Sequence, residues 1–343
     1  MTSFWSKLQK PFAVMAPMAD VTDPAWRALV AKQGRPAVTW TEFVSADGLW
    51  HLNKASTGVP QTQGAPAARP IPPFASDTPV SANPLMRDLA FTEAERPIVA
   101  QFFTAKPPMM AYAAKLAEEL GFDGVDINMG CPDRAIEKQG AGAAMVKTPA
   151  AAQAVIRAAQ EASSLPVSVK TRIGWNAESI DEWIPALLET KPTALTVHLR
   201  TRKELSLVPA HWEVMPRIVA LRDQLAPETR VIGNGDVQSL DEAREKCAEY
   251  GCDGVMIGRG IFGNPWVFAG RASEDTPLPE KLAALVELAH AFEALRPAKN
   301  FAILKKHIKA FVTGFDGAAE FRATLMAAEN ASELEDICRA SYN

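Results

Sequence analysis

The sequence lacks the features that mark membrane, secreted and disulfide-rich proteins. It contains no apolar run of about 18 residues, the length that would span a bilayer. The short apolar stretch at its start is broken by Pro11 and Pro17, unlike the layout of a secretory signal peptide. Four cysteines in 343 residues are too few for a disulfide scaffold and indicate a reducing compartment. We therefore expect a cytoplasmic protein without membrane contact.

The chain also lacks a strong excess of either charge. Its 36 basic and 40 acidic residues give a net charge of −4, which argues against a generally basic protein that coats nucleic acid. A local basic patch remains compatible with this balance. Hydrophobic residues make up 48% and charged residues 22%, so the chain can bury a substantial core and is not expected to be disordered. Its length allows two domains of about 150 residues or one large barrel.

Short runs rich in β-branched residues alternate with helical patterns from residue 12 to residue 260. The eight runs cover residues 12–19, 37–45, 97–103, 124–130, 166–174, 194–201, 231–237 and 254–260. Strands that alternate with helices pair in parallel, and eight of them favour a closed (β/α)₈ barrel over an open doubly wound sheet. The sequence therefore predicts an α/β fold of the TIM-barrel type.

After residue 272 the pattern changes to helices alone. Apolar residues recur at helical spacing along one face, namely Leu282, Leu285, Val286, Ala289 and Phe292. We expect a catalytic barrel over residues 1–272, followed by a small all-helical domain over residues 273–343. A second irregularity is the Pro-rich connection at 57–84, where a surface excursion and a lid over the site are both compatible with the composition.

The helical segment contains a basic stretch without acids between residues 296 and 309. Its lysines are Lys299, Lys305, Lys306 and Lys309. Lys305 and Lys309 are four apart and Lys299 and Lys306 seven apart, so one helical face could present several cations. Taken alone, the pattern fits a solvated helix face better than an anion-binding patch.

Polar residues gather where the predicted strands end, which is where the active site of a (β/α)₈ barrel forms. In chain order they are Asp20, Gln101, Asn128, Cys131, Lys170, Arg172, His198, Arg200, Asn234, Asp236 and Arg259. Any one of them could be a structural polar group, but the set indicates an active site.

Two glycine-containing turns follow the last two predicted strands, GNGD around Gly235 and GRG around Gly258. Glycine lets backbone N–H groups approach an anion closely, and Arg259 can bind an oxyanion through its guanidinium. These turns are the usual phosphate site of the architecture, so a phosphate-bearing cofactor such as FMN fits. Tight turns also use glycine, and neither motif decides the matter alone.

Cys131 lies in NMGCPDR, just past the fourth predicted strand. A free cysteine is most often a small buried hydrophobe. A thiol with a pKa of about 8.5 is mostly protonated at neutral pH and could act as a general acid. Cys247, Cys252 and Cys338 look structural, and because the histidines are scattered we expect no metal site.

Eight motifs resemble, in order and position, those of the tRNA-dihydrouridine synthases. They are APMADVTDPAWR, TEFVSADGL, DINMGCP, GAGAAMVKTP, VSVKTRIGW, VHLRT, VIGNGDV and VMIGRGIFGNPW. The resemblance covers the barrel from residue 16 to residue 268 and continues more weakly through the helical tail. NMGCP followed by GAGAA and KTRIGW is a specific combination, unlike a lone glycine motif.

The resemblance implies an FMN-bound barrel that uses NADPH to reduce the flavin and then reduces the C5–C6 bond of uridine in tRNA. Lys170 would stabilise the negative charge of the reduced flavin. The residues that the resemblance assigns to FMN are Pro17, Met18, Ala19, Gln101, Lys170, His198, Asn234, Gly235, Asp236, Gly258 and Arg259.

The resemblance also implies that hydride passes to C6 of uridine while Cys131 delivers a proton to C5 from the opposite face. The target base must leave its stack, so contacts with tRNA outside the pocket are required. The basic stretch of the tail would then bind phosphates of the tRNA. The resemblance also implies a monomer. The implied substrate-binding residues are Asn128, Arg172, Arg200, Lys299, Lys305, Lys306 and Lys309.

Two departures from the family pattern are Thr104 and Leu199, both of which stand where a glycine is usual. They leave the cysteine, the lysine and the phosphate turns intact. One alternative is an FMN barrel acting on a free pyrimidine, like a dihydroorotate or dihydropyrimidine dehydrogenase. Another is a barrel that binds RNA without catalysis, although Cys131, Lys170 and Arg259 together argue against it. The sequence does not reveal which uridine of tRNA would be reduced.

Overall fold

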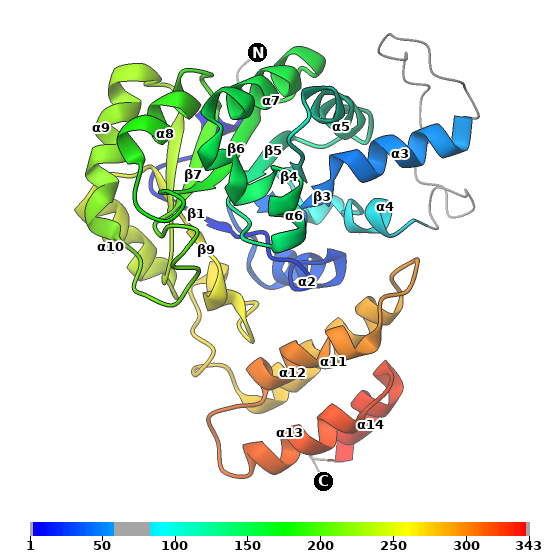
Figure 1. The fold of residues 1–343 in the computed structure, drawn as a ribbon. Coiled ribbons are helices and arrows are strands. Elements are labelled where there is room, and N and C mark those ends of the chain that lie inside the picture. Colours follow the sequence, from blue (N-terminus) through cyan, green and yellow to red (C-terminus); the bar gives the residue numbers. More distant parts are fainter. Residues whose placement is uncertain (1–2, 58–82, 341–343) are drawn as a thin grey trace.

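The computed structural model describes residues 3–57 and 83–340 (Figure 1). The Pro-rich connection at 57–84, for which we considered a lid, falls almost entirely outside the described residues. None of the helices in the described ranges is long and apolar enough to cross a membrane.

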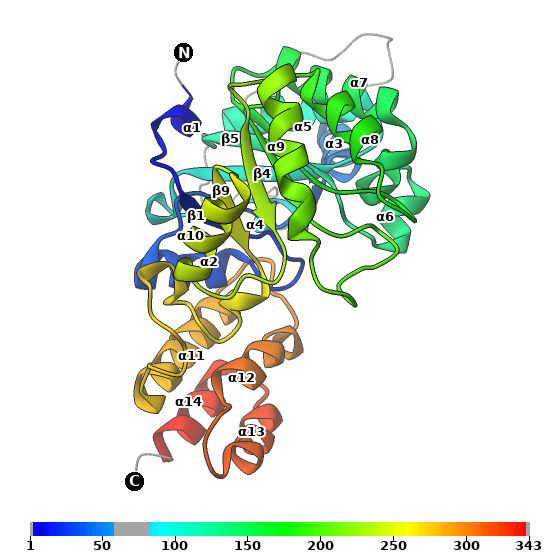
Figure 2. The same cartoon turned by 90° about the vertical axis from the view of Figure 1, so that its left-hand side faces the viewer.

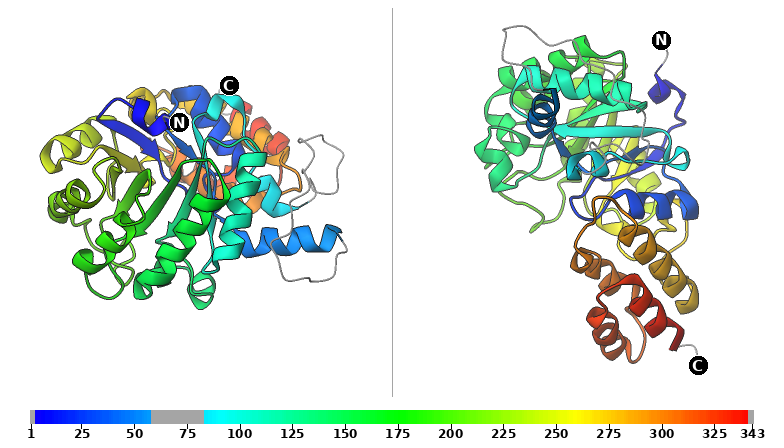
Figure 3. Two further views of the ribbon diagram at one scale, coloured as in Figure 1. Left: turned by 90° about the horizontal axis from the view of Figure 1, so that it is seen from above. Right: turned by 90° about the vertical axis from the view of Figure 1, so that its right-hand side faces the viewer.

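One parallel sheet curls into a barrel with its helices outside, as the view along the barrel shows (Figure 3). Its strands are β1 (Phe12–Met15), β2 (Thr39–Trp40), β3 (Val44–Ser45), β4 (Ile98–Phe103), β5 (Gly124–Met129), β6 (Val167–Arg172), β7 (Ala194–His198), β8 (Arg230–Asn234) and β9 (Gly254–Ile257). Their order is β1-β9-β8-β7-β6-β5-β4-β2. Backbone bonds from Ala37 to Ala13 (3.0 Å) and from Met15 to Val38 (3.4 Å) join the two ends. The predicted TIM-barrel fold is confirmed.

The second predicted strand, 37–45, is interrupted in the structure. Both β2 and β3 pair with β4, and Thr41, Glu42 and Phe43 separate them. The Thr41 side chain accepts a hydrogen bond from the Gln101 N–H (3.0 Å), which replaces a ladder bond. Glu42 accepts one from the N–H of Val21 (3.2 Å). The interruption therefore places a carboxylate at the end of the barrel where the strands finish.

Helices surround the barrel because their apolar faces pack on strands that are buried on both sides. The longer ones are α2 (Pro24–Gly34), α3 (Ala46–Thr57), α5 (Pro107–Glu119), α7 (Pro149–Ala162), α8 (Ile180–Leu188), α9 (Met215–Leu225) and α10 (Leu240–Tyr250). The short ones are α1 (Phe4–Lys7), α4 (Pro84–Asp88) and α6 (Arg134–Lys138). Single 3₁₀ turns lie at Glu93–Glu95, Gly142–Lys147, Trp212–Val214, Arg259–Ile261, Val267–Ala269 and Phe301–Ile303.

Four helices follow the last strand, as expected for the tail. They are α11 (Leu278–Glu293), α12 (Lys305–Phe311), α13 (Ala318–Ala327) and α14 (Ala331–Ala340). They lie together at one end of the molecule, below the barrel in Figures 1 and 2. The His307 ring of α12 stacks on Trp26 of α2 with ring centroids 4.5 Å apart. The boundary between residues 272 and 273 stays a prediction, because one hydrophobic core runs from the barrel helices into α11 and α12.

Lys299 is not part of a basic helical face, so that assignment has to be corrected. It precedes a 3₁₀ turn, and its side chain is only 4% exposed. Its ammonium lies 3.2 Å from Glu42, 3.5 Å from Asp20 and 3.6 Å from Asp23. Burial disfavours the charge of Lys299, but the neighbouring carboxylates outweigh burial and raise the pKa of Lys299. Burial raises the pKa of Glu42 to about 7. Lys299 thus joins the tail to the loop after β1.

Replacing Lys299 by methionine should lower the free energy of unfolding by about 3 kcal/mol, because the buried carboxylates would lose their positively charged partner. The loss should shrink from about pH 9 to about pH 6, since the pKa of Glu42 is about 7 with Lys299 present and higher without it, and protonation of Glu42 removes the uncompensated charge. Denaturant unfolding at the two pH values measures the effect. Lys309→Met, at an exposed lysine of the same tail, is the matched control and should change stability by at most about 0.5 kcal/mol. Equal losses in the two variants would contradict the buried role of Lys299.

Candidate active site

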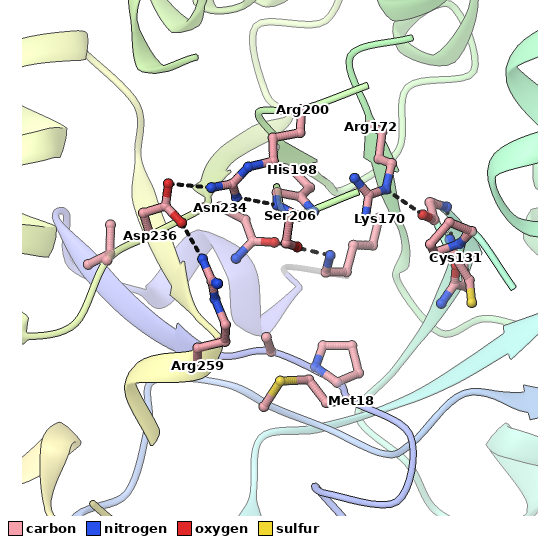
Figure 4. Close-up of a pocket in the computed structure, with 18 of the residues that line it drawn as sticks. Met18, Cys131, Lys170, Arg172, His198, Arg200, Ser206, Asn234, Asp236 and Arg259 are labelled. Carbon is pink, nitrogen blue, oxygen red and sulfur yellow. Dashed lines mark hydrogen bonds and ion pairs between the residues drawn. The ribbon is translucent and has the colours of Figure 1, made fainter. Parts of the chain in front are cut away.

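A cavity of about 230 Å³ opens at the carboxyl ends of the barrel strands (Figure 4). Most of the predicted site residues line it: Pro17, Met18, Asn128, Cys131, Lys170, Arg172, His198, Arg200, Asn234, Gly235, Asp236, Gly258 and Arg259. They come from β1, β5, β6, β7, β8 and β9 or the loops that follow, so residues far apart in the chain converge in one place. Phe43, Ser206 and Gln238 also line the cavity and were not predicted.

Asn128 fixes the turn that carries Cys131. Its side-chain oxygen accepts hydrogen bonds from the N–H groups of Gly130 (3.1 Å) and Cys131 (2.9 Å). Its amide nitrogen donates to the side-chain oxygen of Gln101 (3.0 Å). Gln101 in turn donates to the Asp126 carboxylate (2.6 Å). A chain of buried polar side chains therefore positions the backbone at the thiol.

Gln101 is not among the residues that line the cavity. Its side chain is fully buried, donates one amide N–H to Asp126 and accepts a hydrogen bond from Asn128, and these two bonds leave a second N–H and a second oxygen lone pair. The assignment of Gln101 to the cofactor stays a prediction, and the two bonds show that Gln101 also supports Asn128. Ala19 also falls outside the cavity lining, because the lining on this loop ends at Met18.

Asp126, which lies behind the cavity wall, is a further residue of the site that the sequence analysis did not predict. It is completely buried on β5, and burial raises its pKa to about 6 despite hydrogen bonds from Ser168 and Gln101. The signal was a carboxylate in the middle of an otherwise apolar strand, GVDINMG. A buried carboxylate needs partners, and these partners are what align Gln101.

The Cys131 thiol stays protonated at neutral pH. Burial raises its pKa, and the charge of Asp133 works in the same direction. The opposing charges of Arg172 and Lys170 are smaller influences, but both would stabilise a thiolate once it formed. Cys131 is therefore suited to give up a proton and not to act as a resting nucleophile.

Lys170 and Arg172 project from β6 into the cavity (Figure 4). The Lys170 ammonium donates to the Asn234 side-chain oxygen (3.2 Å). Burial, aided by the charge of Arg172, lowers the pKa of Lys170 to about 8. Arg172 donates through Nε to the Gly130 carbonyl (2.8 Å) and through Nη1 to the carbonyls of Thr201 (3.1 Å) and Leu205 (2.9 Å). Arg172 thereby ties the loops after β5 and β7 together.

The opposite end of the cavity carries the groups suited to an anion. Asp236 accepts hydrogen bonds from the guanidinium groups of Arg200 and Arg259 and from the Ala210 N–H (2.8 Å). Although burial opposes this, the Arg200 hydrogen bond lowers the pKa of Asp236, so the carboxylate is ionised. Asp236 thus holds the Arg259 guanidinium beside the glycine turns.

His198 is neutral, and its tautomer follows from its partner. Its Nε2 lies 3.0 Å from Nη1 of Arg200, and because a guanidinium can only donate, Nε2 accepts. The proton therefore resides on Nδ1. Burial together with the neighbouring charge of Arg172 lowers the pKa of His198 well below its usual value. His198 can offer one N–H to a ligand without adding charge.

The two glycine turns leave room for a phosphate. At Gly258 an added Cβ would make ordinary van der Waals contacts with the Ala16 methyl group, 3.6 Å away, and the Met18 sulfur, 4.0 Å away, so the absence of a side chain keeps this edge of the cavity clear. Gly235 has a φ of +140°, and a Cβ would lie 2.6 Å from that of Ala210. Only glycine suits such a turn. With the Arg259 guanidinium, 56% exposed, beside them, these turns fit the phosphate of a flavin mononucleotide.

The remaining lysines of the predicted patch lie on α12, apart from the residues that line the cavity. Lys309 is exposed and Lys306 half-buried. Lys305 donates to the Met326 carbonyl (2.7 Å) and so also braces α12 against α13.

Known proteins with this pattern identify the family. The dihydrouridine synthase family model matches residues 14–70 and 75–343. The chain is 36% identical over 339 residues to a "probable tRNA-dihydrouridine synthase 2" of Bacillus subtilis, covering 98% of this chain and 95% of that protein. This chain belongs to the dihydrouridine synthase family. A "probable tRNA-dihydrouridine synthase" of Staphylococcus aureus (strain COL) is also 36% identical, over 338 residues, covering 98% of this chain and 94% of that protein.

Solved structures share the architecture of this dihydrouridine synthase family member. Histamine dehydrogenase from Rhizobium sp. 4-9 superposes with a TM-score of 0.50 at 13% identity, over 85% of this chain and 50% of that one. At such low identity the likeness concerns the fold alone. Family membership confirms the resemblance seen in the motifs and makes the chain a flavin-dependent oxidoreductase.

Proposed function

We propose that the chain is a tRNA-dihydrouridine synthase that uses NADPH and FMN to reduce the C5–C6 bond of a uridine in tRNA. The observation that carries this proposal is the juxtaposition of Cys131, Lys170 and the anion-binding turns around one cavity. A protonated thiol at one end and phosphate donors at the other suit a flavin bound between them. The family match and the names of its relatives favour tRNA over the alternative, a free pyrimidine.

The cavity residues divide into those suited to the flavin ring and those suited to its phosphate. Pro17 and Met18 give an apolar wall for the ring, and Lys170 with Asn234 gives polar contacts at its edge. The phosphate would be held by the residues His198, Gly235, Gly258 and Arg259, with Arg259 leaving Asp236 for the ligand. Bound FMN supplies the hydride that uridine accepts at C6.

Cys131 supplies the second hydrogen, as a proton to C5 of the uracil ring. Asn128 holds the thiol-bearing backbone through two N–H hydrogen bonds. Once the proton leaves, the thiolate faces the positive charges of Arg172 and Lys170, which stabilise it. Arg172 also keeps the Cys131 turn in register with the loop after β7. General acid catalysis of this kind typically contributes about 10² to 10⁴ in rate.

The tRNA itself is too large for the cavity, so its backbone must be held elsewhere. The exposed Lys309 and the half-buried Lys306 of α12 are suited to this task, since phosphates are bound mainly through lysine and arginine. The four cysteines all lie in the described residues and form no disulfide, which fits the reducing cytoplasm that we propose as the location of the enzyme.

Replacing Lys306 and Lys309 together by alanine should weaken tRNA binding about tenfold and reduce its salt slope by about 2. The reason is that two phosphate contacts, each coupled to counterion release, would be lost. Filter binding or fluorescence anisotropy over a salt series measures both quantities. Lys115→Ala on α5, an exposed lysine of the barrel, is the control. An unchanged salt slope would show that the lysines of α12 do not contact tRNA phosphates and that this helix face is only solvated.

The proposed function itself is tested with tRNA from a strain that lacks the gene. Purified protein should carry flavin absorbance and, with NADPH, should form dihydrouridine that mass spectrometry locates at defined positions of that tRNA. Free uracil and uridine serve as competing substrates in the same assay. Turnover of the free pyrimidine with no product in tRNA would replace the proposal by its alternative.

A further inference from the structure

The loop between β7 and the 3₁₀ turn Trp212–Val214 presents leucines to solvent at the rim of the cavity. Among the residues that the structure describes, the large apolar side chains that are exposed are Leu205, Leu207, Leu225 and Met326. Two of the four belong to this one loop. Leu207 is 82% exposed, at least twice the fraction of any of the others. A single exposed leucine needs no explanation, but two in one loop beside the active-site cavity form a small apolar surface.

The leucines flank a residue of the active site. Ser206, between them in the chain, lines the cavity and lies near His198 and Arg172 in Figure 4. The Leu205 carbonyl accepts a hydrogen bond from Arg172 Nη1 (2.9 Å). The same guanidinium binds the Gly130 carbonyl (2.8 Å), one residue before Cys131. The exposed leucines are therefore connected to the acid by a short chain of contacts.

The loop is held in shape, so the exposure of its leucines is built in. Leu205 has a φ of +54°, a left-handed conformation that a branched side chain adopts only where its surroundings impose it. The bond from Arg172 to the Leu205 carbonyl is one constraint on the loop. A second is the hydrogen bond that the Leu207 N–H donates to the Glu204 carbonyl (2.9 Å). The Glu204 carboxylate accepts from the Thr201 N–H (2.7 Å). These bonds fix a turn whose apolar side chains point away from the core.

One exposed lysine stands beside the leucines. Lys203, two residues before Leu205, is exposed. Arg202 packs over the Trp175 ring, 4.8 Å from its centroid, and pairs with the Glu137 carboxylate, while Glu204 lies 3.0 Å from His211. The rim thus combines apolar tips with the exposed Lys203 and with an arginine that already has a carboxylate partner. RNA offers base faces for the leucines and a phosphate for Lys203.

We propose that Leu205 and Leu207 contact the bases that flank the target uridine, with Leu207 filling the gap that this uridine leaves in the stack. The inference rests on the proposed function and adds how the base is kept outside its helix. A nucleotide must be extruded to reach a pocket of this depth, and the unpaired neighbours then expose their faces. Proteins that disrupt base stacks use apolar side chains as wedges at such points.

The test compares Leu207→Ala with Leu225→Ala in the flavin-loaded enzyme. Leu225, at the end of α9, lies among residues from the amino-terminal ends of β7 and β8, at the opposite end of the barrel. Leu207→Ala should lower kcat/KM for tRNA about tenfold, a loss comparable to one base contact. Leu225→Ala should not change it. Leu207→Met, which restores apolar bulk, should recover most of the activity.

Three further measurements separate a base contact from other roles. The rate of flavin reduction by NADPH and the thermal unfolding temperature should stay unchanged in Leu207→Ala, because the side chain touches neither the cavity nor the core. The salt slope of tRNA binding should also stay unchanged, since no phosphate contact is removed. A reduced slope would instead assign the loop to the RNA backbone.

The outcomes distinguish this inference from the proposed function. Absence of dihydrouridine with the wild-type enzyme would overturn the proposed function. An active wild type with a fully active Leu207→Ala variant would overturn the leucine contact alone. Sedimentation of the wild type as a dimer and of Leu207→Ala as a monomer would show that a second copy covers the leucines, and would likewise overturn it.

Discussion

Replacing Cys131 by alanine should lower dihydrouridine formation at least about 100-fold, because it removes the group that protonates C5. The flavin content and the rate of flavin reduction by NADPH should be unchanged. This separation is expected because Cys131 lies on the β5 loop, whereas the anion-binding turns lie on β8 and β9. Product formation by mass spectrometry and flavin reduction by absorbance measure the two effects.

Two further variants make the Cys131 result specific. Cys131→Ser keeps the shape but offers a hydroxyl that releases its proton far less readily, so it should be nearly as inactive as Cys131→Ala. Cys247→Ala removes a buried thiol on α10 and should keep full activity. Full dihydrouridine formation by Cys131→Ala would exclude the thiol as the acid.

The pH dependence follows from the raised pKa of Cys131. A thiol that must give up its proton works only while protonated, so its contribution is present at low pH and lost as pH rises through its pKa. Because burial raises that pKa, the loss comes above the range of an ordinary thiol. Cys131 therefore does not limit the enzyme near neutral pH.

The barrel could be predicted from the sequence because each strand carries its own local signal. A run of β-branched residues followed by an amphipathic helix repeats along the chain, and the polar residues that end the strands fall at one end of any closed parallel barrel. The strand at 37–45 was predicted as continuous because its interruption depends on side chains. Thr41 and Glu42 bind backbone groups of Gln101 and Val21, contacts that no local pattern reveals.

Lys299 shows why the basic stretch was harder to interpret. Its charge is visible in the sequence, but its carboxylate partner Glu42 lies 257 residues away in the chain. Spacing along a predicted helix cannot show such a pairing, and the chain in fact forms a 3₁₀ turn after this residue. Gln101 shows the same limit. Its place at the end of a predicted strand could be read from the sequence, but its hydrogen bonds to Asp126 and Asn128 could not.

The role that we infer for Leu205 and Leu207 could not be predicted from the sequence. In the sequence they are two apolar residues in a loop, which is unremarkable because isolated exposed leucines are common. What sets them apart is the left-handed turn at Leu205 and the bond from Arg172 that fixes it. The sequence places Arg172 among the substrate-binding residues, but it does not show that Arg172 also binds the Leu205 carbonyl.

Replacing Lys170 by methionine should slow turnover about 100-fold, the size of effect that loss of one charge-stabilising donor produces. The deficit should appear in the flavin reduction step, in contrast to that of Cys131→Ala, because Lys170 contacts Asn234 at the cofactor end of the cavity. Stopped-flow absorbance with NADPH measures it. The midpoint potential of the flavin should also become more negative, since the reduced form loses a positive neighbour.

The pH profile provides the sharpest test of Lys170. Because burial lowers its pKa to about 8, the ammonium is charged below that pH and neutral above it. Flavin reduction in the wild type should therefore decline as pH rises through about 8. The decline should be absent in Lys170→Met, which is slow throughout, and should move to higher pH in Lys170→Arg, which keeps its charge. A decline at about pH 8 that persists in Lys170→Met would assign the titration to another group, and Lys170 would then serve only to hold Asn234.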